Sequence, residues 1–183
     1  MKLYKHDSYE QYLKAQVRKN RRKRNRHWVS NQELTFMANV IRERCDGLSF
    51  GICHGVRTGL ENKALSELLG VEVVGTDLVC RDGVMEMDFH DRMAEWEGSA
   101  DFVYSNSLDH SHNPYLALCA WRDSLRPGGL LLIHFGREHK HGTPDAADCF
   151  LASKEEYREM LSEFGSVEEI KMFGRTLFVV RVP

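Results

Sequence analysis

Four short segments of the sequence carry side chains that can bind a ligand or move a proton, and each comes at the end of an apolar run. They are residues 51–59, 76–78, 88–91 and 105–114. In open α/β sheets, ligands bind beyond the carboxyl ends of the strands. We therefore expect these segments to meet at one edge of a sheet and to form the functional site.

The first segment reads GICHGVRTG. Glycine at positions 51, 55 and 59 lets the backbone approach a ligand, and the helix that follows begins with free N–H groups that suit an anion. Arg57 adds a cation that we expect to contact a substrate. A turn of this kind is not diagnostic by itself, because glycine there also serves close packing.

The second and third segments each place a carboxylate after a strand. Asp77 follows the glycine turn by about twenty residues, a spacing at which a carboxylate accepts hydrogen bonds from ribose hydroxyls. Asp88 can accept from an adenine amino group while the ring of Phe89 packs on the base. The alternatives are a turn residue at Asp77 and a helix cap at Asp88.

The fourth segment reads SNSLDHSHNP and is the predicted catalytic edge. A carboxylate beside an imidazole suits general-base catalysis, so we take Asp109 and His110 as the catalytic candidates and His112 as a substrate contact. The same residue types also cap helices, and a helix is predicted to begin near Pro114.

The elements that would position these segments alternate between strands and helices, which is typical of a parallel sheet covered by helices. Strands are predicted at 48–53, 71–76, 84–88, 101–105, 129–135, 167–173 and 175–182, and helices at 57–69, 91–96, 114–125 and 153–164. The last two strands are separated only by Gly174 and its neighbours. So short a connection requires an antiparallel hairpin.

Two further helices are predicted before this core, at 8–26 and from Ser30 or Asn31 to residue 46, where Gly47 ends the second. We expect residues 1–47 to form a helical extension packed on a single domain at 48–183. The extension carries twelve Lys and Arg against five Asp and Glu, and its basic residues concentrate at 18–26. Arg18–Arg26 is either a solvated helix face or a surface for nucleic acid or an acidic partner.

Composition limits the class of protein. The chain has 183 residues, a net charge of −2 and 42% apolar residues. We expect a protein without a membrane span or a secretory signal, located in the cytoplasm. Its five cysteines are widely spaced and include no CxxC pair, so we expect free thiols.

Taken in order, the glycine turn, Asp77, Asp88, SNSLDHSHNP and LRPGGLLLIHF resemble the motifs of class I S-adenosylmethionine-dependent methyltransferases. The resemblance covers about residues 48–183. It implies an α/β fold with a Rossmann-like, mostly parallel seven-stranded sheet, helices on both faces and an antiparallel last strand. ICHGVRTGLE, MDFHD and YSNSLDHS also resemble a poorly characterised subgroup of methyltransferase-like proteins.

The resemblance implies S-adenosylmethionine as the cofactor and an unidentified methyl acceptor as the substrate. The residues that it implies for cofactor binding fall into four groups. Gly51, Cys53, His54 and Gly55 would line the methionine part, Asp77 and Leu78 the ribose, Asp88 and Phe89 the adenine, and Ser105 and Asn106 the transferring methyl group.

The first motif departs from the family. Members usually carry an acidic residue and two glycines near the end of the first strand, whereas Gly51 and Cys53 stand at the acidic and first-glycine positions. Modified cofactor binding, binding of the demethylated product and loss of transfer are all compatible with this departure.

Three other readings compete. A metal-dependent enzyme is suggested by His110, His112, His134, His139 and His141, although no spacing of a known metal site appears and we predict none. A catalytically silent binding protein would use the basic segment. A nicotinamide dehydrogenase fits less well, because the full GxGxxG motif is absent and a hairpin closes the chain.

Overall fold

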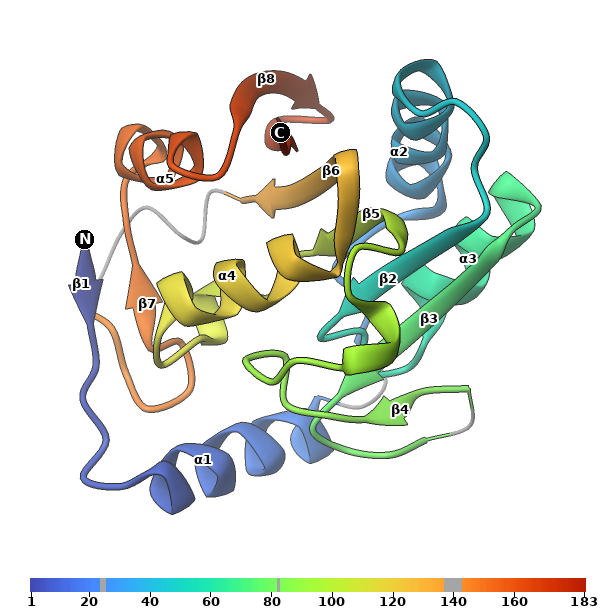
Figure 1. Ribbon diagram of the computed structural model, residues 1–183. Coiled ribbons are helices and arrows are strands. Elements are labelled where there is room, and N and C mark those ends of the chain that lie inside the picture. The colour runs from blue at the N-terminus through green and yellow to red at the C-terminus, as the bar shows by residue number, and fades with distance from the viewer. Residues whose placement is uncertain (24–25, 82, 137–142) are drawn as a thin grey trace.

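The computed structural model describes residues 1–23, 26–81, 83–136 and 143–183 (Figure 1). Within these ranges the α-helices are α1 (Tyr9–Arg22), α2 (Asn31–Arg44), α3 (Leu60–Leu69), α4 (Pro114–Ser124) and α5 (Lys154–Ser162). The strands are β1 (Lys2–Leu3), β2 (Phe50–His54), β3 (Glu72–Asp77), β4 (Met85–Glu86), β5 (Ala100–Ser105), β6 (Leu125–Phe135), β7 (Phe150–Leu151), β8 (Ser166–Met172) and β9 (Arg175–Arg181).

One sheet contains seven strands in the order β4-β3-β2-β5-β6-β9-β8. The strands β2 to β6 pair in parallel, and β9 is antiparallel to both β6 and β8. Phe173 and Gly174 form the turn of the closing hairpin with φ of 47° and 83°, the positive values that a two-residue turn favours. The predicted Rossmann-like, mostly parallel seven-stranded sheet with an antiparallel last strand is confirmed.

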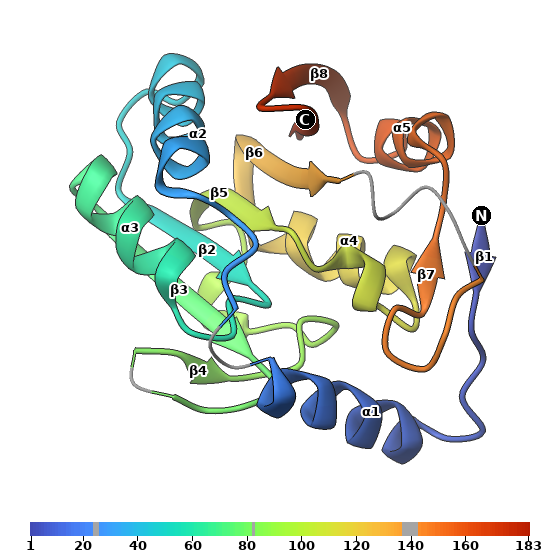
Figure 2. The ribbon, with the colours of Figure 1, turned by 180° about the vertical axis from the view of Figure 1, so that it is seen from behind.

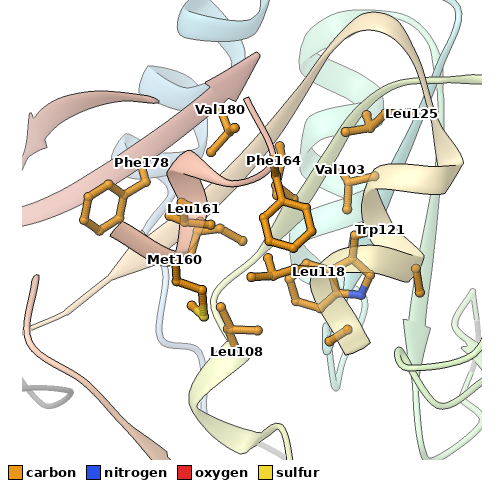
Figure 3. Packing of buried hydrophobic residues seen from close by; sticks show 14 of the residues in the cluster. Val103, Leu108, Leu118, Trp121, Leu125, Met160, Leu161, Phe164, Phe178 and Val180 are labelled. Carbon is orange, nitrogen blue, oxygen red and sulfur yellow. The ribbon is translucent and has the colours of Figure 1, made fainter. Parts of the chain in front are cut away.

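Helices cover both faces of this sheet, as Figures 1 and 2 show. One apolar cluster joins the sheet to α4 and α5, and a second joins it to α2 and α3. Figure 3 shows the first cluster, to which Trp121 of α4, Leu161 of α5 and Val103 of β5 belong. Neighbouring strand residues point to opposite faces, so Phe102 belongs to the second cluster.

Helix α1 does not cover a face; it runs along the edge where the carboxyl ends of the strands lie (Figures 1 and 2). The hydroxyl of Ser8 caps α1 by accepting a hydrogen bond from the backbone N–H of Gln11 at 3.2 Å. The side of α1 turned toward the protein buries Tyr12, Lys19 and Asn20. Helix α1 therefore stands where a ligand of the sheet would bind.

Two local features differ from the sequence-based expectation. Residues 91–96 were expected to be helical but form only a 3₁₀ turn at Ala94–Trp96, because six residues are too few to offset the cost of nucleating an α-helix. The short antiparallel pair of β1 with β7 was not expected. Its two-residue strands are too short to show a period in the sequence.

The five cysteines form no disulfide, in agreement with the prediction of free thiols. A helix with the length and apolarity needed to cross a membrane is not found in the described part of the chain.

Candidate functional site

Two adjoining cavities lie at the carboxyl edge of the sheet. The large cavity has a volume of about 330 Å³, and the small cavity has a volume of about 50 Å³. Their described linings share Lys19, Gly55, Arg57, Ser107 and His110. The turn after β2, the turn after β5 and helix α1 therefore meet between them.

Asp77, at the end of β3, forms the floor of the small cavity together with Leu78. Its Oδ2 accepts a hydrogen bond from the backbone N–H of Arg57 at 2.8 Å, and its Oδ1 accepts one from the side-chain amide of Asn20 at 2.5 Å. Burial raises the pKa of Asp77. A donor from α1 thus occupies one oxygen of the carboxylate that the sequence assigns to a ribose.

Asp88 is also bound by α1. Its Oδ2 accepts a hydrogen bond from the phenol of Tyr9 at 2.6 Å, and its Oδ1 contacts Nδ1 of His90 at 2.5 Å. Burial acts to raise the pKa of Asp88, but the bonds from His90 and Tyr9 outweigh it, so the pKa lies below its ordinary value. Phe89 lines the small cavity, whereas Asp88 lies behind it.

The contacts of Tyr9 and Asn20 make α1 a cover over both carboxylates. Burial and the Asp88 carboxylate raise the pKa of Tyr9, so its phenol keeps its proton and donates. The small cavity, at about 50 Å³, holds no nucleoside while these side chains are in place. A nucleoside would fit the small cavity only after a displacement of α1.

We predict that Tyr9→Phe loosens this cover. The variant loses one hydrogen bond to an ionised carboxylate, and we expect a nucleoside ligand to associate about fivefold faster. Stopped-flow fluorescence can follow the reaction, because the indole of Trp121 donates to the backbone oxygen of Phe89 at 2.8 Å, beside the small cavity. Tyr115→Phe, at an exposed site on α4, is the matched control. Equal association rates in both variants would contradict the role of α1 as a cover over the two carboxylates.

Three residues of the glycine segment lie inside the sheet rather than at a cavity. A Cβ on Gly51 would overlap the ring of Phe102, and Cys53 is fully buried in β2. His54 donates to or accepts from the hydroxyl of Thr76 at 2.7 Å, and burial lowers its pKa to about 3, so the ring is neutral. Neither cavity has these residues in its described lining.

Gly55 differs from them, because it lines both cavities. Its φ is 73°, and a Cβ at this position would lie 2.6 Å from the side chain of Ser107. Ser105 is fully buried; its hydroxyl donates to the backbone oxygen of His54 and accepts from the N–H of Ser107, both at 3.1 Å. Ser105 thus positions the turn, and Asn106 and Ser107 reach the large cavity.

Asp109 and His110 both line the large cavity. Nδ1 of His110 lies 2.7 Å from the backbone oxygen of Ala147 and 3.2 Å from the ammonium group of Lys19. Its Nε2 lies 3.9 Å from Oδ1 of Asp109. This is the arrangement of an imidazole that can take a proton from a substrate.

Among the described histidines of the metal hypothesis, His110 and His134 line the same large cavity. His112 packs against Tyr12 and His90, away from the large cavity that His134 lines, and His139 and His141 lie outside the described residues. A different group, Asp109, His110 and Asp148, has ligand atoms within 4.8 Å of one another. The ammonium group of Lys19 already pairs with Asp148 there and lies 3.2 Å from Nδ1 of His110.

The basic segment divides into two sets of side chains. Lys19, Lys23 and Arg26 line the large cavity. Arg18, Arg21 and Arg22 are exposed on the outer side of α1, and Arg24 lies outside the described residues.

Residues that the sequence did not indicate complete the site. Tyr9, Lys19 and Asn20 come from α1, far from the strand ends in sequence, and no pattern links them to the cavities. Glu61, in the first turn of α3, lines the large cavity with an exposed fraction of 7%. The sequence could have pointed to Glu61 only through its position in the helix turn that follows the glycine segment.

Neither a family model nor a curated protein matches the sequence. Solved structures do match. The 1,6-didemethyltoxoflavin-N1-methyltransferase of Burkholderia thailandensis, solved with its substrate and S-adenosylhomocysteine, gives a TM-score of 0.72 at 14% identity, over 98% of this chain and 91% of that one. The amino pentose methyltransferase CalS10 of Micromonospora echinaspora, solved with S-adenosylmethionine, gives 0.67 at 17% identity, over 98% and 100%.

Larger proteins match as well. The methyltransferase domain of a citrinin polyketide synthase gives a TM-score of 0.61 at 14% identity over 83% of this chain, which spans about half, 52%, of that chain. The sheet order and the edge at which the cavities lie are those of a Rossmann-like α/β protein. The particular fold is that of the class I S-adenosylmethionine-dependent methyltransferases.

Proposed function

We propose that this chain is an S-adenosylmethionine-dependent methyltransferase that binds the cofactor from the small cavity to Gly55 and the methyl acceptor in the large cavity. The position of Asp77 carries the proposal. Its carboxylate ends β3, faces the small cavity and accepts hydrogen bonds through both oxygens. A ribose diol can replace the amide donor of Asn20 there.

The residues at this edge suit the cofactor. Gly55 lines both cavities, and Phe89 and Leu78 provide apolar walls for a base. Asp88 would accept from the adenine amino group once the phenol of Tyr9 has moved. Displacement of α1 is thus part of cofactor binding.

In a methyltransferase the bound cofactor supplies an electrophilic methyl group on a sulfonium centre. The chain's own contribution is to hold the acceptor in line with that group and to remove a proton where the acceptor carries one. His110 would perform the second task, because its imidazole lines the large cavity together with the carboxylate of Asp109. Asn106 and Ser107 line the large cavity and would position the acceptor.

Isothermal titration with S-adenosylmethionine and with S-adenosylhomocysteine tests the proposal. We expect micromolar binding of at least one of them and no binding of NAD, which serves as the control for the dehydrogenase alternative. Absence of binding by both ligands would overturn the function and leave the fold as a scaffold.

A scaffold of that kind has one specific candidate surface, formed by the exposed Arg18, Arg21 and Arg22 of α1. Selective binding of one nucleic acid that persists at moderate salt, without cofactor binding, would favour it, because nonselective phosphate contacts weaken steeply as salt is added.

A further inference from the structure

The space for an acidic side chain at the first motif position is occupied. The ring of Phe102, on the neighbouring strand β5, fills the volume where a side chain on Gly51 would project. Phe102 is fully buried in the cluster between the sheet and α2 and α3. The usual anchor for the cofactor's amino group therefore has no place on β2.

Another carboxylate faces the neighbouring cavity. Glu61 follows the left-handed N-cap Gly59 and lies in the first turn of α3, which brings its side chain into the wall of the large cavity. The side chain is 7% exposed, and Oε2 is a buried oxygen without a hydrogen-bond partner in the described residues. Asn106, after β5, acts on the same carboxylate to lower its pKa. A buried carboxylate with an open acceptor position suits an ammonium donor.

A residue of opposite charge lines the same cavity. The Arg57 guanidinium acts on the Glu61 carboxylate to lower its pKa, against the larger effect of burial. Its Nη1 donates to the backbone oxygen of Arg26 at 3.2 Å, while its buried Nε has no hydrogen-bond partner in the described residues. A carboxylate and a guanidinium lining one cavity can bind the ammonium and the carboxylate of an α-amino acid.

We propose that Glu61 binds the α-ammonium group of the cofactor's methionine part and Arg57 its carboxylate, so that the anchor missing from β2 is supplied by the start of α3. This inference rests on the proposed function. Gly55 connects the two regions, because it lines the small cavity with Asp77 and the large cavity with Glu61. The amino acid end of the ligand would thus lie along the turn from Gly55 to α3.

The burial of Glu61 makes the charge of its carboxylate, and with it the proposed binding of an ammonium group, dependent on pH. Burial raises the pKa of Glu61 to about 7, against smaller opposing effects of hydrogen bonds and of Arg57. An ammonium ligand needs the ionised carboxylate, so affinity for such a ligand should fall as the pH is lowered through about 7. The groups that face Glu61 from the surrounding elements are Arg57 before α3, Asp77 of β3, Asn106 after β5, and Cys53 and Tyr104 of β2 and β5.

The test compares ligands that differ only in the amino acid end. S-Adenosylhomocysteine carries both charged groups, and 5′-methylthioadenosine carries neither. We expect Glu61→Gln to weaken binding of S-adenosylhomocysteine about 30-fold, the effect of losing one charge-assisted bond, and to change binding of 5′-methylthioadenosine less than about twofold. Glu67→Gln, at an exposed position of the same helix, is the matched control and should change neither affinity.

Titrations over pH 6 to 8 give a second readout that a structural role would not change. Wild type should lose affinity for S-adenosylhomocysteine toward pH 6, by up to about tenfold per unit of pH, while Glu61→Gln should show a flat profile. Equal affinities of wild type and Glu61→Gln for S-adenosylhomocysteine would overturn the role of Glu61 and leave the proposed function intact. Failure of wild type to bind either ligand would instead overturn the proposed function.

Discussion

Asp77→Ala is expected to weaken binding of S-adenosylhomocysteine by at least about 100-fold, the loss of two charge-assisted hydrogen bonds to a ribose diol. The variant removes the carboxylate that ends β3 and faces the small cavity. Isothermal titration at pH 7.5 measures the affinity, and a thermal unfolding curve shows whether the variant is folded.

Asn20→Ala provides the matched control for that experiment. It removes the amide that donates to Oδ1 of Asp77 and leaves the carboxylate in place. Because the amide competes with a ligand for the same oxygen, we expect Asn20→Ala to leave the affinity unchanged or to raise it. A loss of affinity in Asn20→Ala equal to that in Asp77→Ala would show that the bond between them is structural and would remove the argument for a ribose site at Asp77.

Gly51→Asp is expected to destabilise the fold by more than about 4 kcal/mol, although it restores the acidic residue typical of the family. The new side chain would enter the volume of the Phe102 ring and bury a carboxylate in an apolar cluster. Urea unfolding followed by circular dichroism measures the effect.

The steric part of this prediction can be separated by a double-mutant cycle. Gly51→Ala adds only the Cβ, and Phe102→Leu removes ring atoms from the same space. The two changes together should cost less than the sum of their separate costs, because the smaller residue makes room for the Cβ. If Gly51→Asp were as stable as wild type, the predicted overlap with the Phe102 ring would be wrong. A carboxylate on β2 could then bind the amino group of the cofactor, as the family motif implies.

The sheet could be predicted because its signals are local. Each buried strand is a short apolar run, and the closing hairpin follows from Gly174 standing almost alone between two strands. The positions of Asp77 and Asp88 at the edge of the sheet could be predicted for the same reason, since a residue that follows a strand must lie at that edge. These parts of the site depend only on the order of the elements.

The remaining parts of the site depend on contacts between distant segments. Asn20 and Tyr9 reach the strand ends only because α1 folds across them. Cys53 and His54 have the spacing of the family motif, but the strand extends through them and buries them in the sheet. Glu61 looks like an ordinary acidic residue in the first turn of a helix, a position that the helix dipole favours, and the sequence does not show that it is buried.

The two cavities share a wall, and this has a consequence for the order in which ligands bind. Lys19 lines both cavities, and Lys23 lines the large one, so the movement of α1 that admits a cofactor also removes part of the wall around an acceptor. Under the proposed function, the acceptor's site would be complete only after α1 has closed again. We therefore expect the cofactor to bind first and the acceptor second, and an acceptor bound beforehand to hold α1 in place and slow the entry of the cofactor.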